Sequence, residues 1–509
     1  MKHFAKKLTC LLMTVLMLAV MILPVAAEEL LIATNTVPAA WDGTVAGAFA
    51  GGTGTEADPY LISNAQELAL IASNVNNSVT DYLGVYFKQT ANINLDGAAW
   101  TSIGYSKEAL SFKGNYDGDH FTIYNILNVP EDPTDEKYSI YNGLFGWVEG
   151  STIQNIQMVG GSVTGTKYAG AVVGYLIGGT VYNCVSDIEF VTGWQIGGVV
   201  GRAEKGESNL IKGCVNHTKV YSMNDKDSSN AFVGGIIGGS GNTEIRYCAN
   251  YGEIIASNAT SYCVAGGIIG IQGASGSPTL VDNCMDMGIV SVNALDSTAN
   301  IGAGGICGKA AHVSFAEITN CFTAGTYSSN KEDFVGGIAG LVDPAKVVSV
   351  DNLYTTFEKA AGTDALGQVS ATILKEDEMK GVAGIAKMGL DSAWVAEGDM
   401  LPQVDVTKIA AAEADPGVET TTTTEETTTT AAVTDVNTTE PDVTTTEPAE
   451  TEPAETEPVT TTVPAQDDTP EPAVVKTRDN TILIAILSVA IVAVVGAMAA
   501  VVIVSKKKK

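Results

Sequence analysis

The chain has 509 residues, with 58 acidic residues against 28 Lys and Arg and a formal net charge of −30. This balance argues against a nucleic-acid partner, because binding to the phosphate backbone needs a basic surface. Of the 8 cysteines, Cys10 lies in an N-terminal segment that we expect to be removed, which leaves an odd number at scattered spacings. Such a set is a poor disulfide framework.

The first residues predict export. Residues 1–27 have a basic start, a long apolar run and small residues at Ala26 and Ala27. This pattern is typical of a secretory signal peptide, with cleavage expected before Glu28.

The other end of the chain predicts a membrane anchor carried on a stalk. Residues 480–505 form an apolar stretch long enough to span a bilayer, and the lysines at 506–509 should stay on the cytoplasmic side. Residues 411–479 are built almost wholly of Thr, Glu, Asp, Pro, Ala and Val. We expect this segment to be a disordered, extended stalk, because it has too little apolar surface to offset the entropy of ordering. The body would therefore be extracellular.

A glycine motif repeats about seven times between these ends. One copy reads "FVGGIIGGSGNTEIRYCANYGEI", from Phe232 to Ile254, and the copies lie about 27 to 38 residues apart. β-branched residues occur in pairs or alternate between the glycines, which indicates short strands, whereas glycine at this density would cost a helix about 1 kcal/mol each. Glycine also permits positive φ and close backbone approach at corners. Stacked copies predict an all-β fold, a right-handed parallel β-helix over residues 141–357.

One position of each copy is predicted to face inward and stack from rung to rung. The residues there are Ile156, Cys184, Cys214, Cys248, Cys284, Cys321 and Leu353. A position that accepts Cys, Ile or Leu is typical of a buried structural site, and free cysteine behaves as a small hydrophobe. A metal or redox ladder is the alternative, although only His120, His217 and His312 remain after signal removal. An asparagine ladder is expected just before it, at Asn155, Asn183, Asn283, Asn320 and Asn352.

The motif GG-[IV]-[IV]-G, variable polar residues and x-I-x-N-C resembles the GLUG repeat. That repeat occurs in bacterial surface proteins, including adhesins and the non-catalytic regions of some IgA peptidases. Upstream, "FAGGTGTEADPYLISNAQELALIASNVN" and "FKGNYDGDHFTIYNI" resemble the module that commonly precedes such repeats. The resemblance implies a β-helical surface protein without implying one ligand.

The two ends of the β-helix should be covered. Residues 28–140 are expected to hold a helical cap and the first rungs. Ser63 and Gln66 have capping-box spacing, and an apolar helical face follows at Ala65, Leu68, Ala69, Ala72 and Val75. Residues 358–410 are expected to form a closing segment at the other end.

Little in the sequence indicates catalysis. It contains no HExxH, GxSxG or P-loop, and the glycine strings lack the strand–turn–helix context of a dinucleotide site. The best cluster is Asp117, Asp119 and His120 in "YDGDH", which either bends the chain as a glycine turn or provides carboxylates for a polysaccharide lyase, a glycosidase or calcium. We favour the turn. We therefore predict no enzyme activity, cofactor or metal.

The sequence as a whole favours a single-pass cell-surface protein, expected in a Gram-positive bacterium. The function we predict is adhesion, or binding of an extracellular glycan or protein whose identity stays open. The alternatives are a β-helical polysaccharide-degrading enzyme using the Asp117 cluster, and a structural envelope spacer.

Overall fold

A computed structural model describes residues 37–105, 110–130, 140–204, 208–222, 229–273, 278–312, 315–343, 345–346, 348–363 and 367–414. The predicted signal peptide, the predicted membrane span at 480–505 and the lysine tail lie outside these residues, as does the predicted stalk from residue 415 onward. None of the helices in the described part is long and apolar enough to cross a membrane.

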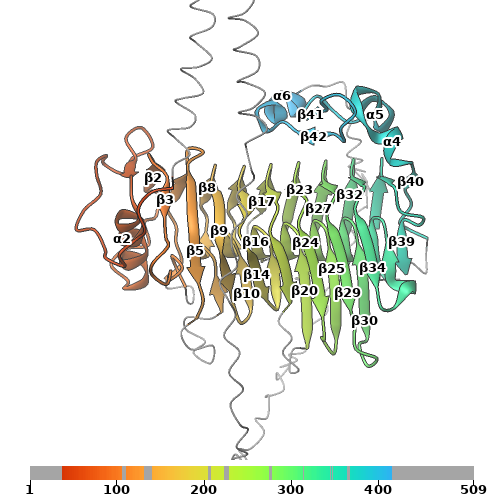
Figure 1. The fold of residues 1–509 in the computed structure, drawn as a ribbon, viewed down its shortest axis with the longest axis horizontal. Helices are drawn as coiled ribbons and strands as arrows, with labels where there is room; N and C mark the ends of the chain where they lie inside the picture. The colour runs from red at the N-terminus through yellow and green to blue at the C-terminus, as the bar shows by residue number, and fades with distance from the viewer. Residues whose placement is uncertain are drawn as a thin grey trace, which may run out of the picture. The chain divides into compact units, whose positions relative to one another are not determined.

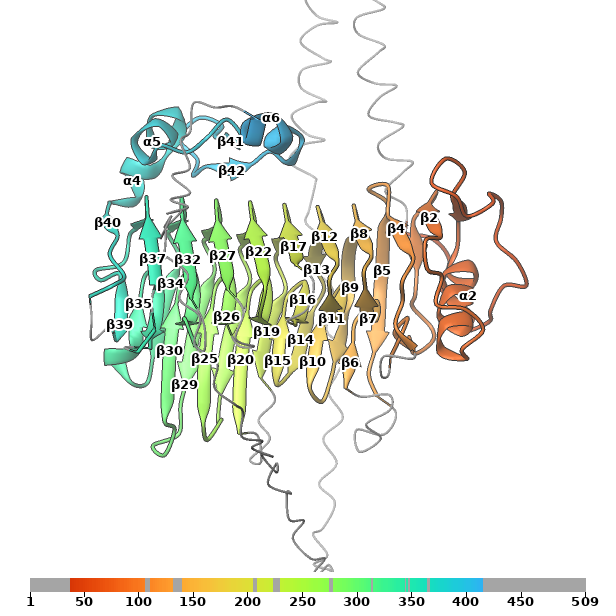
Figure 2. The same cartoon turned by 180° about the vertical axis from the view of Figure 1, so that it is seen from behind.

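The body is a solenoid of parallel strands, as predicted, and Figures 1 and 2 show its rungs side by side. We name its four long sheets A to D. Sheet A contains β1 (Tyr60–Ile62), β2 (Tyr86–Gln89), β4 (Asn115–Asp117), β8 (Thr152–Gln154), β12 (Thr180–Tyr182), β17 (Asn209–Lys212), β22 (Thr243–Arg246), β27 (Thr279–Asp282), β32 (Ala316–Thr319) and β37 (Val348–Asp351).

Sheets C and D are joined by glycine turns. Sheet C contains β7 (Phe145–Glu149), β11 (Val173–Ile177), β16 (Val200–Ala203), β21 (Ile237–Ser240), β26 (Ile269–Gln272), β31 (Cys307–Ala310), β36 (Ala339–Val342) and β39 (Ala361–Thr363). Sheet D contains β6 (Tyr141–Asn142), β10 (Tyr168–Gly170), β15 (Gln195–Gly197), β20 (Asn230–Gly234), β25 (Tyr262–Gly266), β30 (Asn300–Gly304) and β35 (Val335–Gly336).

Sheet B receives two strands from most rungs. It contains β3 (Ile93–Asn94), β5 (Thr122–Asn128), β9 (Gln157–Thr164), β13 (Val185–Asp187), β14 (Phe190–Gly193), β18 (Val215–Asn216), β19 (Lys219–Ser222), β23 (Ala249–Asn250), β24 (Glu253–Ser257), β28 (Met285–Asp286), β29 (Ile289–Asn293), β33 (Phe322–Thr323), β34 (Thr326–Ser329), β38 (Tyr354–Thr355) and β40 (Thr372–Ile373). A typical rung runs from sheet D through C and A to B, and each strand pairs in parallel with the same strand of the next rung.

The recurring glycines are needed because sheets C and D approach closely. A Cβ on Gly238 in sheet C would lie 2.8 Å from the carbonyl oxygen of Ile196 in sheet D, closer than real Cβ atoms come to backbone. Positive φ, which we also expected at these corners, is not the reason, since Gly234, Gly235 and Gly238 are absent from the positive-φ glycines of the described chain. The motif therefore encodes close packing.

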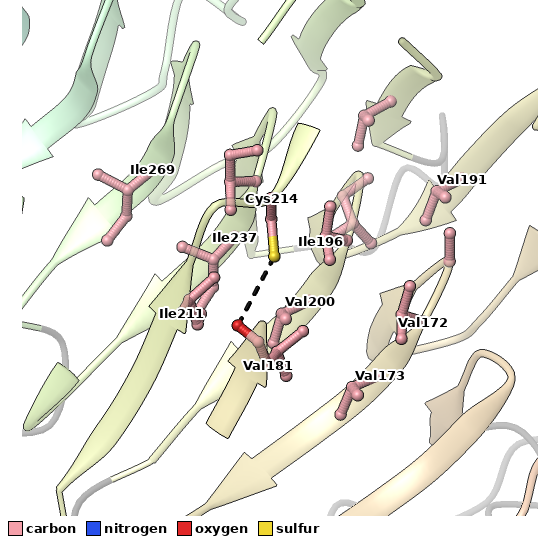
Figure 3. Close-up of a cluster of buried hydrophobic side chains, with 14 of the residues drawn as sticks. Val172, Val173, Val181, Val191, Ile196, Val200, Ile211, Cys214, Ile237 and Ile269 are labelled. Carbon is pink, nitrogen blue, oxygen red and sulfur yellow. Dashed lines mark hydrogen bonds between the residues drawn. The ribbon is translucent and has the colours of Figure 1, made fainter. Parts of the chain in front are cut away.

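The interior is a continuous apolar core. Val181, Ile211, Ile245 and Val281 stack in register along sheet A with no exposed surface. Figure 3 shows Cys214 among such side chains, with its Sγ 3.6 Å from the carbonyl oxygen of Val181. Each rung thus buries its inner face against its neighbours, which a single copy could not do.

Helix α2 (Ala65–Asn76) packs on the first rungs through the predicted face, and Ala65, Leu68, Ala69, Ala72 and Val75 are all buried. The predicted capping pair was wrong by one residue. The N-cap is Asn64, whose side-chain oxygen accepts a hydrogen bond from the backbone amide of Glu67. In return, the carboxylate of Glu67 accepts a hydrogen bond from the backbone amide of Ser63. The residue that bonds back to the Ser63 amide is therefore Glu67 and not the predicted Gln66.

The C-terminal segment does more than cover the last rung. β39 and β40 extend sheets C and B, but the chain then folds back along the side of the β-helix (Figures 1 and 2). We call residues 374–414 the strap. It contains α4 (Glu376–Met379), α5 (Gly381–Met388), the antiparallel pair β41 (Trp394–Val395) and β42 (Gln403–Val404), η3 (Val406–Lys408) and α6 (Ile409–Ala414). Another short 3₁₀ helix, η2 (Glu332–Phe334), lies in the last rungs.

Residues 411–414, which the sequence predicts to be part of the stalk, belong to this strap. They complete α6, and Ala412 is buried together with Tyr247, Ala393 and Ile409. The alanine-rich sequence is compatible with a helix, and its packing on the β-helix orders it.

Candidate functional site

Asp117 stands at the end of β4, where its carboxylate joins a turn to the next rung. Its Oδ1 accepts from the backbone amide of Asp119 at 2.9 Å and from Nδ2 of Asn155 at 2.8 Å. Its Oδ2 accepts from Nε2 of Gln154 at 3.0 Å. These bonds are those of an aspartate that stabilises a bend and starts the side-chain ladder.

Asp119 and His120 form the turn itself. Both have positive φ, 45° and 65°, and the backbone amide of His120 donates to the carbonyl of Asn155 at 3.1 Å. The Oδ2 atom of Asp119 lies 3.1 Å from Nζ of Lys88, in a pair that is partly exposed. Among the contacts of the described residues, none joins the His120 ring to either carboxylate. The turn interpretation therefore accounts for all three residues.

A pocket of about 580 Å³ lies on the outer face of sheet A and includes Asp117. Two rows of side chains from three successive rungs form its floor. Strand register aligns Lys88, Asp117 and Gln154 in one row, and Tyr86, Asn115 and Thr152 in the other. Glu56, Ala57 and Pro59 from the N-terminal loop form one wall, whereas neither Asp119 nor His120 contributes to the lining.

The polar groups of this pocket are held in place by the rungs. Oδ1 of Asn115 accepts from the backbone amide of Thr152 at 3.0 Å, and Gln154 is fixed by its bond to Asp117. The pocket combines amides, hydroxyl groups, charges of both signs and the aromatic rings of Tyr86, Phe87 and Tyr116. Convergent polar groups of this kind suit a ligand rich in hydroxyl and amide groups.

Sequence reasoning found Asp117 but missed the rest of this pocket. Tyr86, Lys88 and Glu56 carry no motif. The available signal was strand alternation, which places Tyr86 and Lys88 on one face with buried Phe87 between them. Aligning β2, β4 and β8 as rungs would have grouped the two rows, but those rungs precede the regular glycine repeat.

The predicted cysteine position is buried throughout. Cys184, Cys214, Cys248, Cys284 and Cys321 have no exposed surface, Ile156 is fully buried, and Leu353 is 4% exposed. The backbone amide of Cys248 lies 3.4 Å from Sγ of Cys284 in the next rung. All seven cysteines of the described residues are free thiols. Within the same residues, no group of three or more His, Cys, Asp or Glu side chains is arranged to hold a metal ion.

The asparagine ladder is present and has a gap. Asn155, Asn183, Asn283, Asn320 and Asn352 all have φ between 51° and 55°. Nδ2 of Asn352 donates to Oδ1 of Asn320 at 2.9 Å. Likewise, Nδ2 of Asn183 donates to Oδ1 of Asn155 at 2.8 Å. Gly213 and Tyr247 hold the equivalent positions in the two rungs between Asn183 and Asn283, also with positive φ. The strap contacts the β-helix at those two residues.

No protein-family model matches the chain. Halomucin of Haloquadratum walsbyi is 36% identical over 176 residues, which are 32% of this chain and 2% of that protein. A protein of Evansella cellulosilytica named "Putative Gly-rich membrane protein" is 30% identical over 152 residues, 28% of this chain and 16% of that protein. The matches thus span a small part of either relative, one of which is a membrane protein by name.

Among solved structures, "a putative immunoglobulin A1 protease from Bacteroides ovatus" superposes with a TM-score of 0.44 at 21% identity. The superposition covers 71% of this chain and 98% of that one. At these values we infer nothing from the neighbour. The parallel solenoid rests on the strand pairing described above.

Proposed function

We propose that this chain is a membrane-anchored bacterial cell-surface protein that binds an extracellular glycan or protein, with the sheet A pocket as its contact site. The observation that carries the proposal is the pocket, whose floor is two in-register rows of polar side chains on β2, β4 and β8. The apolar segment at 480–505 and the relative named as a membrane protein support the location. The GLUG-like motif supports a surface role.

A binding role without catalysis is favoured by how the carboxylates are used. Both oxygens of Asp117 accept hydrogen bonds from the chain, and Asp119 is paired with Lys88. A general acid or base must reach the substrate's proton. These two carboxylates are instead engaged in holding the turn.

The test is binding of the purified full-length protein to a glycan and extracellular-matrix array. We expect a saturable signal that Tyr86→Ala and Glu56→Gln each reduce at least tenfold. Thr180→Ala is the matched control, because Thr180 follows Thr152 in the same row one rung beyond the pocket. Equal binding by all variants would remove the pocket from the proposal, and an empty array would favour the envelope spacer.

A polysaccharide-degrading enzyme is the second candidate, because Glu56 and Asp117 line the same pocket. It predicts soluble products from an arrayed polysaccharide and their loss in Glu56→Gln. Retention of intact polysaccharide by the wild type would exclude this candidate for the polymers on the array.

A further inference from the structure

The strap ends far from where it begins. The backbone amide of Leu374 donates to Thr355 in the last rung at 2.9 Å. Trp394 then packs on Phe322, with ring centroids 5.2 Å apart, and its Nε1 donates to Oδ1 of Asn283 at 3.2 Å. At the far end Glu413 pairs with Lys212 at 2.7 Å. The described chain thus ends beside β17, several rungs before the last.

The gap in the asparagine ladder coincides with this path. The hydroxyl of Tyr247 lies 2.7 Å from Oδ2 of Asp391. A Cβ on Gly213 would lie 3.2 Å from a methyl carbon of Val406 and 3.5 Å from one of Ile409. The ladder residue is therefore replaced where the strap needs a hydroxyl donor or empty space. The residues at the two ladder positions are thus matched to the strap residues that pack on them.

We infer that the strap is a lateral tether that peels from the β-helix before any rung opens when the chain is pulled from beyond Ala414. The load in the organism would come through the anchor, so this role rests on the proposed surface attachment. The peeling itself is a property of the described residues. It can therefore be tested whether or not the anchor exists.

The order of events follows from where the load enters. A pull at Ala414 acts first on the Lys212–Glu413 pair and on the small cluster of Tyr247, Ala393, Ile409 and Ala412. The larger cluster around Trp394, Phe322 and Met388 is loaded only after the first one has opened. A partly exposed ion pair adds little resistance. Contacts that break one after another resist less than rungs whose four sheets would have to separate together.

Peeling should also be reversible. It would uncover an apolar row on sheet B that the strap now buries, formed by Ala249, Met285 and Phe322. Returning this row to water is unfavourable, so the strap should dock again when the load falls. At up to about 3.3–3.6 Å per residue, the freed segment from Leu374 to Ala414 would span at most roughly 140 Å, and the gain in length is this span less the docked separation of its ends.

The experiment is single-molecule pulling on the protein without residues 1–27 in detergent, with one handle after Lys509 and one on Ile289→Cys. Ile289 is half exposed on β29 and the native cysteines of the described body are buried, so in this protein, which lacks Cys10, the introduced thiol is the reactive one. We expect a first, reversible release of at most roughly 140 Å, the contour length of the strap less its docked end-to-end distance, before any larger event. A single release that includes rungs, or no release of this length, would overturn the inference.

Two variants identify the element that moves. Trp394→Ala should lower the force of the first release, or leave the strap undocked so that the first release is absent. Ser392→Ala, an exposed neighbour, is the control and should behave as the wild type. An unchanged first event in Trp394→Ala would assign that event to another segment and overturn the inference.

A chemical test reports the docked state without load. A carbodiimide should join Lys212 to Glu413 in the full-length protein, as read by mass spectrometry of the digest, because their charged atoms are in contact. Lys212→Arg should abolish this cross-link. Its absence in the wild type would contradict the docked strap, whereas failure of the protein to fractionate with membranes would contradict only the proposed anchoring.

Discussion

Nδ2 of Asn183 donates to Oδ1 of Asn155, one rung earlier in the chain, at 2.8 Å. Asn155 in turn donates to Asp117, so this aspartate, which the sequence favours as part of a turn over a catalytic alternative, is the first member of a structural ladder. Because both asparagines have left-handed backbone, the same residues make the turn and tie neighbouring turns together. Asparagine tolerates that backbone better than most residues.

Asn155→Ala should therefore destabilise the body through two separate terms. Alanine in the left-handed region costs about 1–2 kcal/mol, and the lost side-chain hydrogen bonds cost about 0.5–1.5 kcal/mol each. Asn155→Gly keeps the backbone and loses only the bonds. Urea unfolding of both variants should place the glycine protein between the wild type and the alanine protein, and equal midpoints for the two variants would contradict the backbone term.

Gly238→Ala should be among the most damaging single-methyl changes in the chain. The added carbon would meet backbone of the preceding rung, including the Gly201 carbonyl at 2.7 Å, and backbone cannot rotate away. We expect a loss of roughly 3 kcal/mol or more in the free energy of unfolding. Gly239→Ala is the adjacent control, since its nearest neighbour is a side-chain methyl of Ile271 at 3.1 Å. Similar losses in the two variants would show that glycine content, not close approach, is what matters.

The rungs could be predicted from sequence because each repeats the same constraints. The glycine strings and the inward position recur at one place in each copy, and the positive-φ turn before that position is an asparagine in most of them, so one correct interpretation applied to all. The strap has no such internal copy. Its apolar residues, such as Met388 and Trp394, pack on Phe322 and Met285 from distant rungs, and their spacing alone does not reveal that surface.

The sheet A pocket could not be predicted from the sequence either, for a related reason. Its residues lie on the outside of the first rungs, where alternation marks Tyr86 and Lys88 as exposed but says nothing of what converges on them. Only the register of β2, β4 and β8 brings Lys88, Asp117 and Gln154 into one row. The loop that contributes Glu56 forms its wall without any repeating pattern.

The cysteines should be unreactive until the body unfolds. Burial raises the pKa of the Cys263 thiol to about 11, and it raises the pKa values of Cys184, Cys248 and Cys284 well above the usual range. The thiolate is the nucleophile, so access and ionisation both oppose reaction of these four thiols, and burial also shields the other cysteines of the described body. We expect less than one equivalent of a maleimide to react at pH 8 in native protein and seven after denaturation in the signal-cleaved chain. Fast labelling of several thiols in native protein would contradict the packed ladder.

Asp286 should make the body less stable as pH rises toward neutrality. Its carboxyl is fully buried, and desolvation raises its pKa from 3.8 to about 7 despite hydrogen bonds from Asn250, Tyr327 and the amide of Gly288. Between these two values the folded state binds more protons than the unfolded state. The contribution to stability is therefore complete at acidic pH, is lost by up to about 1.4 kcal/mol per pH unit as pH rises, and levels off above the folded value.

Asp286→Asn should remove this dependence and stabilise the protein at pH 7 by up to ~4 kcal/mol. Asparagine already occupies the register-equivalent positions at Asn216 and Asn250 in the two preceding rungs, so the amide fits the row. Thermal unfolding of wild type and variant between pH 4 and 8 measures the effect, and exposed Asp187→Asn controls for the change in net charge. A variant curve parallel to that of the wild type would show that Asp286 does not titrate in this range.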